Sequence, residues 1–130
     1  MKKRKIINPD PDFQNNLMAF GFDCGKGWHP LIEETLDLIE QQDLPDYFEI
    51  TQIKEKFGEL LIYCNVYFDA IEDIIESATK KSITICEYCG KSAKLRLIND
   101  WWFTTLCDKC LQKRLQEDDT MTYEDVEGER

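Results

Sequence analysis

The sequence predicts an α+β protein: a small body of helices and a β-hairpin, with an appended zinc-ribbon or treble-clef module. Three observations predict this fold. Apolar residues recur at helical spacing in two segments, they alternate with the period of a strand in others, and four of the six cysteines form two C-x-x-C pairs near the C-terminus. A chain of 130 residues fits one domain carrying one such module.

Composition and charge divide the chain into four parts. Residues 1–12 join a basic cluster to two prolines and are expected to form a flexible arm. Residues 13–81 make up the α+β body, and residues 82–116 make up the zinc-binding module. Residues 117–130 are rich in Glu and Asp and poor in apolar side chains, so we expect a disordered acidic tail.

Two helices are expected in the body, besides a short one over residues 13–22. The first covers residues 28–42, where an apolar stripe lies opposite acidic side chains and Pro30 falls in the first turn. The second covers residues 69–81. Its expected N-cap is Asp69, and it ends on two lysines that suit the negative end of its dipole.

Strands are expected on either side of two turns. In the body, residues 47–54 and 60–66 flank a Phe-Gly turn, and apolar residues alternate along the second of them. In the module, residues 94–98 and 101–106 flank an Asn-Asp pair. This second pair of strands is the hairpin expected of a zinc ribbon or a treble clef, and a short helix after the last cysteine favours the treble clef.

The two C-x-x-C pairs provide the expected ligands of one structural zinc ion, Cys86, Cys89, Cys107 and Cys110. Each pair places two thiolates on one tight knuckle, and two knuckles complete a tetrahedron around the metal. Gly90 follows the first knuckle, where a residue that adopts positive φ relaxes the loop. A redox dithiol is the alternative interpretation, but it gives no reason for a second pair.

The predicted zinc shell is closed, so the sequence predicts a protein that is not an enzyme. A catalytic zinc keeps one coordination position for water, whereas four thiolates fill the shell. The single histidine, His29, lies in another segment. We interpret Cys24 and His29 as a loop residue and a helix-start residue, since a catalytic pair needs an orienting group, and we interpret Cys64 as a buried thiol.

Candidate partner-binding residues lie on the body and on the hairpin of the module. The formal net charge is −10, and most of it falls on the body. Glu33, Glu34 and Asp37 share one helix as a candidate docking surface for a basic protein partner; the simpler interpretation is a solvated helix face. Trp101 and Trp102 should point to opposite faces of their strand, so that one packs inward and the other is a candidate anchor for a partner. Packing of the tryptophans against the α+β body is the simpler interpretation.

Nucleic-acid binding is the alternative function. A nucleic-acid binder needs a basic face, and only residues 82–116, with six basic and three acidic side chains, offer one. Lys94 and Arg96 precede the two tryptophans, whose rings would stack on bases. In this alternative the protein is an accessory factor that touches DNA or RNA through its zinc module alone.

The sequence also favours a cytoplasmic protein without membrane contact. Its longest apolar runs are far shorter than a membrane span, and no apolar stretch follows the basic residues at the start of the chain. In a reducing compartment, cysteines at this spacing bind metal rather than form disulfides.

Four short motifs occur in order along the chain: Gly27-Trp28-His29-Pro30-Leu31-Ile32, Gln52-Ile53-Lys54-Glu55-Lys56-Phe57-Gly58, Cys86-Glu87-Tyr88-Cys89-Gly90 and Trp102-Phe103-Thr104-Thr105-Leu106-Cys107-Asp108. Over residues 27–110 the chain resembles a family of small uncharacterised proteins of bacteria and their phages. Two positions depart from that pattern. Glu59 stands where the family often has a second glycine, so the conformation of the hairpin turn is expected to differ. Cys110 stands where the family often has histidine, and either residue can bind the metal.

The resemblance implies a zinc-bearing fold and, by context, a regulatory role, because small acidic proteins of phages are often inhibitors or immunity factors. Taken with the residues themselves, it favours a non-enzymatic, zinc-stabilised protein-binding module. Such a protein would act as an acidic inhibitor, an immunity protein or a phage-encoded regulator on an intracellular partner.

Overall fold

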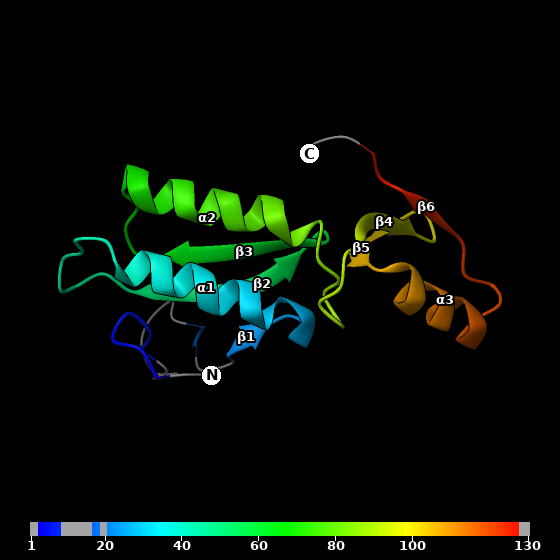
Figure 1. Ribbon diagram of the computed structural model, residues 1–130, viewed down its shortest axis with the longest axis horizontal. Helices are drawn as coiled ribbons and strands as arrows, with labels where there is room; N and C mark the ends of the chain where they lie inside the picture. The colour runs from blue at the N-terminus through cyan, green and yellow to red at the C-terminus, as the bar shows by residue number, and fades with distance from the viewer. Residues whose placement is uncertain (1–2, 9–16, 19–20, 128–130) are drawn as a thin grey trace.

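The computed structural model describes residues 3–8, 17–18 and 21–127 and has the predicted α+β architecture (Figure 1). A body built from the first two-thirds of the chain lies at one end of an elongated molecule, and a smaller C-terminal module lies at the other. The elements follow in the order β1 (Phe22–Asp23), the 3₁₀ helix η2 (Lys26–Trp28), α1 (His29–Glu40), β2 (Ile50–Lys56), β3 (Glu59–Cys64), α2 (Asp69–Ser82), β4 (Lys94–Ile98), β5 (Trp102–Leu106), α3 (Asp108–Glu117) and β6 (Tyr123–Asp125).

The body is a three-stranded sheet covered by two helices. Its strand order is β1-β2-β3, with β1 parallel and β3 antiparallel to β2. Helix α1 packs against α2, and α2 packs against β3. The apolar stripes predicted from the sequence form one core, whose fully buried members include Trp28, Ile32, Leu36, Ile39, Ile53, Leu60 and Ile71.

Both predicted helices of the body are confirmed, with one correction at the start of α2. Pro30 lies in the first turn of α1, where its missing N–H removes no helical bond. The N-cap of α2 is Phe68 rather than Asp69, and the Phe68 side chain makes no capping hydrogen bond. Asp69 is the first helical residue instead. Its negative charge still favours the helix start because the dipole is positive there.

The C-terminal module is a second sheet of order β5-β4-β6 with α3 beside it. Its core is separate from that of the body and consists of Cys86, Ile98, Leu106, Cys107 and Leu111. Helix α3 contains Cys110, so it begins two residues before the last cysteine rather than after it. The succession of knuckle, hairpin and helix matches the zinc-ribbon-like module expected from the sequence and has the helix that favours the treble clef.

The acidic tail is ordered up to residue 127, which corrects the prediction of disorder. Strand β6 pairs antiparallel with β4, and Asp125 forms an ion pair with Arg96 at 2.8 Å. Composition alone favoured disorder because the tail has few apolar residues. A sheet edge and a buried guanidinium from elsewhere in the chain supply the interactions that the tail cannot make by itself. Residues 128–130 lie outside the described part.

The N-terminal arm is also partly ordered, contrary to the prediction. Ile6 and Ile7 are buried in the body core, and the Ile50 N–H donates to the Ile6 carbonyl at 2.8 Å. Arg4 lies against α1, where its guanidinium pairs with Glu33 at 2.7 Å, Asp37 at 2.9 Å and also Glu40; its side chain is only 1% exposed. Residues 9–12 of the predicted arm lie outside the described residues, as does most of the predicted helix over residues 13–22.

Replacing Arg4 by glutamine should lower the free energy of unfolding. The change leaves three carboxylates on one helix face without their cation. We expect a loss of about 2 kcal/mol, smaller than for a fully buried pair because the carboxylates stay partly in water. Urea unfolding of zinc-loaded protein measures it. Lys5→Gln is the matched control, since Lys5 is 81% exposed and its pair with Asp46 spans 3.5 Å; equal losses in the two variants would contradict the assignment.

None of the helices in the described part of the chain combines the length and the apolar character needed to cross a membrane.

Candidate metal centre

The first cysteine knuckle is a tight loop closed by its own backbone. The Cys86 N–H donates to the Lys91 carbonyl at 2.7 Å, and the Gly90 N–H donates to the Cys86 carbonyl at 2.9 Å. Gly90 has a φ of +83°, a conformation that side chains with a Cβ rarely adopt. This local geometry turns Cys86 and Cys89 toward the same side of the loop, as the C-x-x-C spacing predicted.

The second knuckle is the start of α3. Cys107 is the N-cap residue, and its Sγ accepts a hydrogen bond from the Cys110 N–H at 3.3 Å. The helix begins here because a side-chain acceptor at the N-cap satisfies one of the free amides of the first turn. The third cysteine of the cluster, Cys107, therefore caps the helix that carries the fourth cysteine, Cys110.

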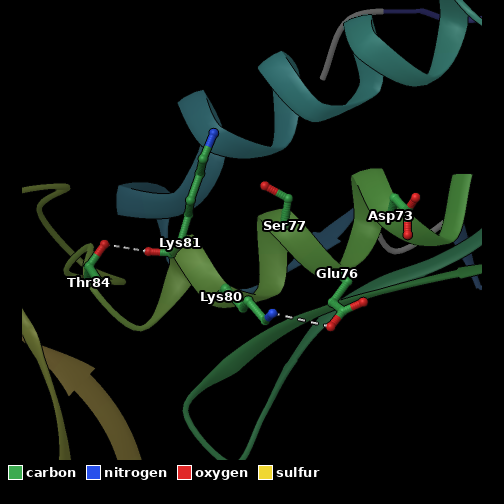
Figure 2. Close-up of a pocket in the computed structure, with 6 residues that line it drawn as sticks. All are labelled: Asp73, Glu76, Ser77, Lys80, Lys81 and Thr84. Carbon is green, nitrogen blue, oxygen red and sulfur yellow. Dashed lines mark hydrogen bonds and ion pairs between the residues drawn. The ribbon is translucent and has the colours of Figure 1, made fainter. Parts of the chain in front are cut away.

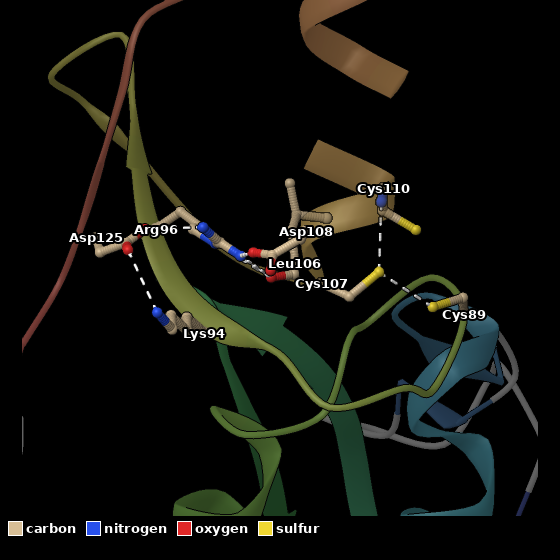
Figure 3. Close-up of polar contacts among 8 residues, drawn as sticks. All are labelled: Cys89, Lys94, Arg96, Leu106, Cys107, Asp108, Cys110 and Asp125. Carbon is tan, nitrogen blue, oxygen red and sulfur yellow. Dashed lines mark hydrogen bonds and ion pairs between the residues drawn. The ribbon is translucent and has the colours of Figure 1, made fainter. Parts of the chain in front are cut away.

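The four cysteine side chains converge on one point. Their Sγ atoms all lie within 4.8 Å of one another. Figure 3 shows three of them, and the Sγ atoms of Cys89 and Cys107 are 3.5 Å apart. A tetrahedral zinc with Zn–S bonds of about 2.3 Å needs sulfurs roughly 3.8 Å apart, so the donor set fits this ion. Four soft thiolates are also the ligand type that favours zinc over hard cations such as Mg²⁺ or Ca²⁺.

The thiols of the cluster differ in how easily they ionise. Burial opposes ionisation of Cys86, but hydrogen bonds from the backbone amides of Cys107, Cys89 and Tyr88 outweigh it and lower the pKa of this thiol to about 7. Burial and the neighbouring thiols raise the pKa of Cys110 to about 12. The cluster therefore holds protons until a cation compensates its charge, and metal binding releases them.

The shell is that of a structural centre. Among the described residues, the potential ligands that gather in one place are these four cysteines, with no histidine or carboxylate joining them. A metal held by all four would have its tetrahedral positions filled by protein. Its chemistry would be to cross-link the two knuckles, and so to hold together a module whose own core is small.

The first knuckle docks on the turn that precedes α1, a contact that the sequence did not reveal. The Gly27 N–H donates to the Glu87 carbonyl at 2.7 Å, and the Gly25 N–H donates to the Glu87 carboxylate at 2.9 Å. A Cβ on Gly27 would overlap the Cys86 carbonyl and lie 2.6 Å from the Gly90 nitrogen. The Gly-x-Gly spacing was the available signal, since it permits this close backbone approach.

Glu87 is the acidic residue enclosed at this junction. It is only 6% exposed, and burial raises the pKa of its carboxyl above the ordinary value, although the hydrogen bond from Gly25 opposes that shift. The indole of Trp28 donates to the Ile85 carbonyl at 2.8 Å beside it. The body and the module are thus joined by hydrogen bonds as well as by close backbone packing.

The Phe-Gly turn between β2 and β3 makes the second contact with the module. Gly58 has a φ of +82°, and its carbonyl accepts a hydrogen bond from the Thr105 hydroxyl at 2.8 Å. A Cβ on Gly58 would overlap the Leu95 side chain and lie 3.2 Å from the Thr104 nitrogen. The sheet of the module therefore has the body turn on one face and α3 on the other. The motifs singled out in the sequence meet at this junction.

The structure separates the two candidate tryptophans as predicted. Trp101 is 75% exposed, whereas Trp102 is half-buried against the module core. The Arg114 guanidinium lies 5.2 Å from the Trp102 ring and 4.4 Å from the Tyr88 ring, so it is stacked between two aromatic side chains. Of the two tryptophans, Trp101 is therefore the one whose ring is accessible to a partner.

The candidate acidic residues of α1 differ in their surroundings. Glu33 and Asp37 are bound to Arg4, as described above, whereas Glu34 is exposed beside Leu38. The signal for the Arg4 contact was the spacing of three carboxylates along one helix face, but the sequence does not show which cation meets them. The acidic surface on α1 is thus partly neutralised from within the chain.

Arg96 is not a surface cation, which corrects its assignment to a nucleic-acid face. It is 3% exposed and donates to the Leu106 carbonyl at 3.0 Å, to Asp108 at 2.7 Å and to Asp125 at 2.8 Å. Lys94 lies 3.8 Å from the same Asp125. The basic residues of β4 therefore contact the acidic tail.

Cys24, His29 and Cys64 keep the structural roles expected of them. Burial raises the pKa of Cys64 to about 12, and burial followed by the nearby Glu87 charge raises the pKa of Cys24 to about 12 as well. A reactive cysteine needs a lowered pKa, so neither thiol is activated. The His29 ring packs edge-on against Phe22, with the centroids 5.2 Å apart.

A surface hollow of about 450 Å³ with no cysteine in its lining lies along α2 (Figure 2). The residues lining it are Asp73, Glu76, Ser77, Lys80, Lys81 and Thr84. All six are exposed, and Lys80 is paired with Glu76 one helical turn away at 3.3 Å. A site for a small molecule normally encloses its ligand among apolar walls, so this hollow is a feature of a charged helix surface.

Comparison of the chain with protein-family models, with curated proteins and with solved structures finds no match. The metal centre therefore stands on the geometry of the chain's own residues, and the resemblance noted in the sequence stays a prediction.

Proposed function

We propose that this protein is a non-enzymatic, zinc-stabilised protein-binding module whose exposed Trp101 anchors an intracellular partner. In this proposal it acts as an acidic inhibitor, an immunity protein or a phage-encoded regulator. The observation that carries the proposal is the position of Trp101 at the tip of the zinc-held hairpin, with three-quarters of its surface in solvent. Tryptophan is one of the side chains that are enriched among the few residues that carry most of the binding energy of a protein interface.

The hairpin tip is braced, which supports an anchoring role. Asn99 and Asp100 both have positive φ, at 53° and 65°, and the Trp101 N–H closes the turn onto the Ile98 carbonyl at 3.2 Å. The tail adds two hydrogen bonds between Asn99 and Thr122, each 2.9 Å long. An anchor on a braced turn loses little conformational freedom on binding, so more of its contact energy becomes affinity.

Charge supports a basic partner. The chain carries 26 acidic and 16 basic side chains, and two of its arginines are enclosed by carboxylates. Positive charge on the partner would speed its association with this acidic protein. Acidic proteins would be repelled, so binding to wrong partners would be suppressed. The nucleic-acid alternative loses support, because Arg96 is buried and Lys94 faces Asp125.

Affinity capture with matched aromatic variants tests the proposal. Immobilised wild-type protein should retain one stoichiometric protein from a nuclease-treated cell extract. Trp101→Ala should weaken that binding about thirtyfold, the loss typical of a strong interface anchor. Tyr47→Ala is the control, because Tyr47 is also largely exposed but lies on the body, and it should bind as the wild type does.

Two results would contradict the proposal. One is capture of the same protein by wild type and Trp101→Ala with equal affinity. The other is tight binding of generic duplex DNA or RNA at moderate salt that is lost when Lys94, Lys113 and Arg114 are changed to glutamate, which would instead support the nucleic-acid alternative.

A further inference from the structure

We propose that the edge of β4 that faces away from β5 is a strand-addition site for a short acidic, extended segment of an otherwise basic partner protein, and that β6 is its occupant within the chain. The inference rests on the proposed function as a protein-binding module and names the site and the peptide chemistry. Strand addition is a general mode of peptide recognition in which backbone hydrogen bonds supply affinity and alternate side chains supply specificity.

The backbone of β6 shows how such a segment binds. Arg96, Leu97 and Ile98 lie opposite Asp125, Glu124 and Tyr123. The Val126 N–H donates to the Leu95 carbonyl, and the Asn99 N–H donates to the Thr122 carbonyl, both at 2.9 Å. Hydrogen-bonded pairs alternate along an antiparallel ladder, so Glu124 and Leu97 form the bonded pair between these two.

Arg96 makes the site selective for a carboxylate. Its guanidinium is fixed from one side by the Leu106 carbonyl and by Asp108, while its Nη1 donates to Asp125 of the added strand (Figure 3). Leu106 belongs to β5 and Asp108 belongs to α3, so these two partners hold the guanidinium in place whichever strand pairs with this edge of β4. Lys94 adds a second positive charge 3.8 Å from Asp125. A buried cation aimed at this position strongly favours an acid there.

Apolar neighbours define the rest of the pattern. Tyr123 lies opposite Ile98, which belongs to the module core, and Val126 lies beside Leu95, which is buried against the body turn. Side chains alternate between the two faces of a strand, so Tyr123 and Asp125 share the face toward α3. The expected ligand is therefore an extended segment with an aromatic residue, any residue, an acid and an aliphatic residue in succession.

The attachment of β6 is weak enough to be displaced. The strand is three residues long, all three residues are exposed, and β4 is the element against which it mainly packs in the described chain. Its tether to α3 gives it an effective concentration of the order of millimolar, which a partner segment must exceed or offset with other contacts. Trp101, on the same hairpin, supplies such a contact.

A peptide of residues 119–127 carrying a fluorescent label is the probe. We expect Glu124→Pro to detach β6, because proline removes the central backbone donor of the strand. The detached variant should bind the peptide one to one and about tenfold or more tightly than Glu124→Ala, whose strand keeps its N–H. A peptide with lysine at position 125 should bind neither protein. Fluorescence anisotropy gives the affinities, with zinc content and circular dichroism as checks of folding.

If Glu124→Pro fails to fold, the unmodified protein still decides the question. A millimolar excess of unlabelled peptide should move the amide resonances of residues 123–126 in the protein to positions typical of unfolded chain, without loss of zinc. A folded Glu124→Pro that binds no better than Glu124→Ala, or unchanged resonances in the unmodified protein, would overturn the strand-addition site. Neither result affects the Trp101-dependent capture, so the proposed function is tested separately.

Discussion

Replacing Cys107 by serine should reduce the zinc content from about one ion per chain to nearly none and should unfold the C-terminal module. Cys107 has two roles: its sulfur lies 3.5 Å from that of Cys89, and it caps α3 through the Cys110 N–H. Zinc binding contributes on the order of 10 kcal/mol to the folding of small modules, far more than the module core can replace. A strong chelator should have the same effect on the wild type.

The body should survive this change. The core around Trp28 is built from residues of the body and has Ile85 as its only partly buried neighbour from the module among the described residues. Far-ultraviolet circular dichroism should therefore retain the signal of α1 and α2, while hydrogen exchange speeds up in β4, β5 and α3. Metal analysis provides the stoichiometry. Cys24→Ser is the control and should keep its zinc, and a wild-type protein that is folded and metal-free would refute the structural role of the site.

Gly27→Ala should produce the second large effect by separating the module from the body. The new methyl group would collide with backbone atoms of the knuckle, the Cys86 carbonyl and the Gly90 nitrogen, which cannot rotate away as a side chain would. Overpacking of this kind destabilises proteins by about 3 kcal/mol. Urea unfolding in the presence of zinc should show that loss, with Trp28 losing its hydrogen bond to Ile85.

Gly21→Ala is the matched control for Gly27→Ala. Gly21 has a φ of +72°, but a Cβ built there meets no described atom within 4 Å, so alanine introduces backbone strain alone, of about 1 kcal/mol. Zinc content should stay at the wild-type value in both variants because the four ligands are untouched. Equal destabilisation by the two substitutions would show that the junction does not depend on close backbone contact.

The course of the chain was predictable wherever the signal was local. The stripe of α1, the alternation in β3 and the spacing of the cysteine pairs each depend on residues a few positions apart, and the structure confirms all three. The difference in exposure between Trp101 and Trp102 was also predicted, but its physical reason differs from strand alternation, because Trp101 lies in the turn and only Trp102 lies in β5. The N-cap of α2 was misplaced by one residue, since the acidic side chain favours the first turn as well as the cap.

Contacts between distant segments account for the predictions that were wrong. Arg4 reaches carboxylates about thirty residues away, and Arg96 binds Asp125 across a similar distance. In the sequence, the first looked like part of a flexible basic arm and the second like a surface cation. Burial and pairing of a charge depend on which surfaces meet, and residue composition does not encode that directly.

The sequence by itself predicted the four clustered cysteines and the order of the main helices and strands, from α1 to α3, because metal chemistry and backbone periodicity are properties of residue type and short-range spacing. Only the tertiary structure decided that the acidic tail completes a sheet, that the glycine turns lock the module to the body, and that two arginines are enclosed. The physical reason is that ordering a charged segment requires a partner surface to supply hydrogen bonds and opposite charge. That surface exists only once residues far apart in the chain have come together.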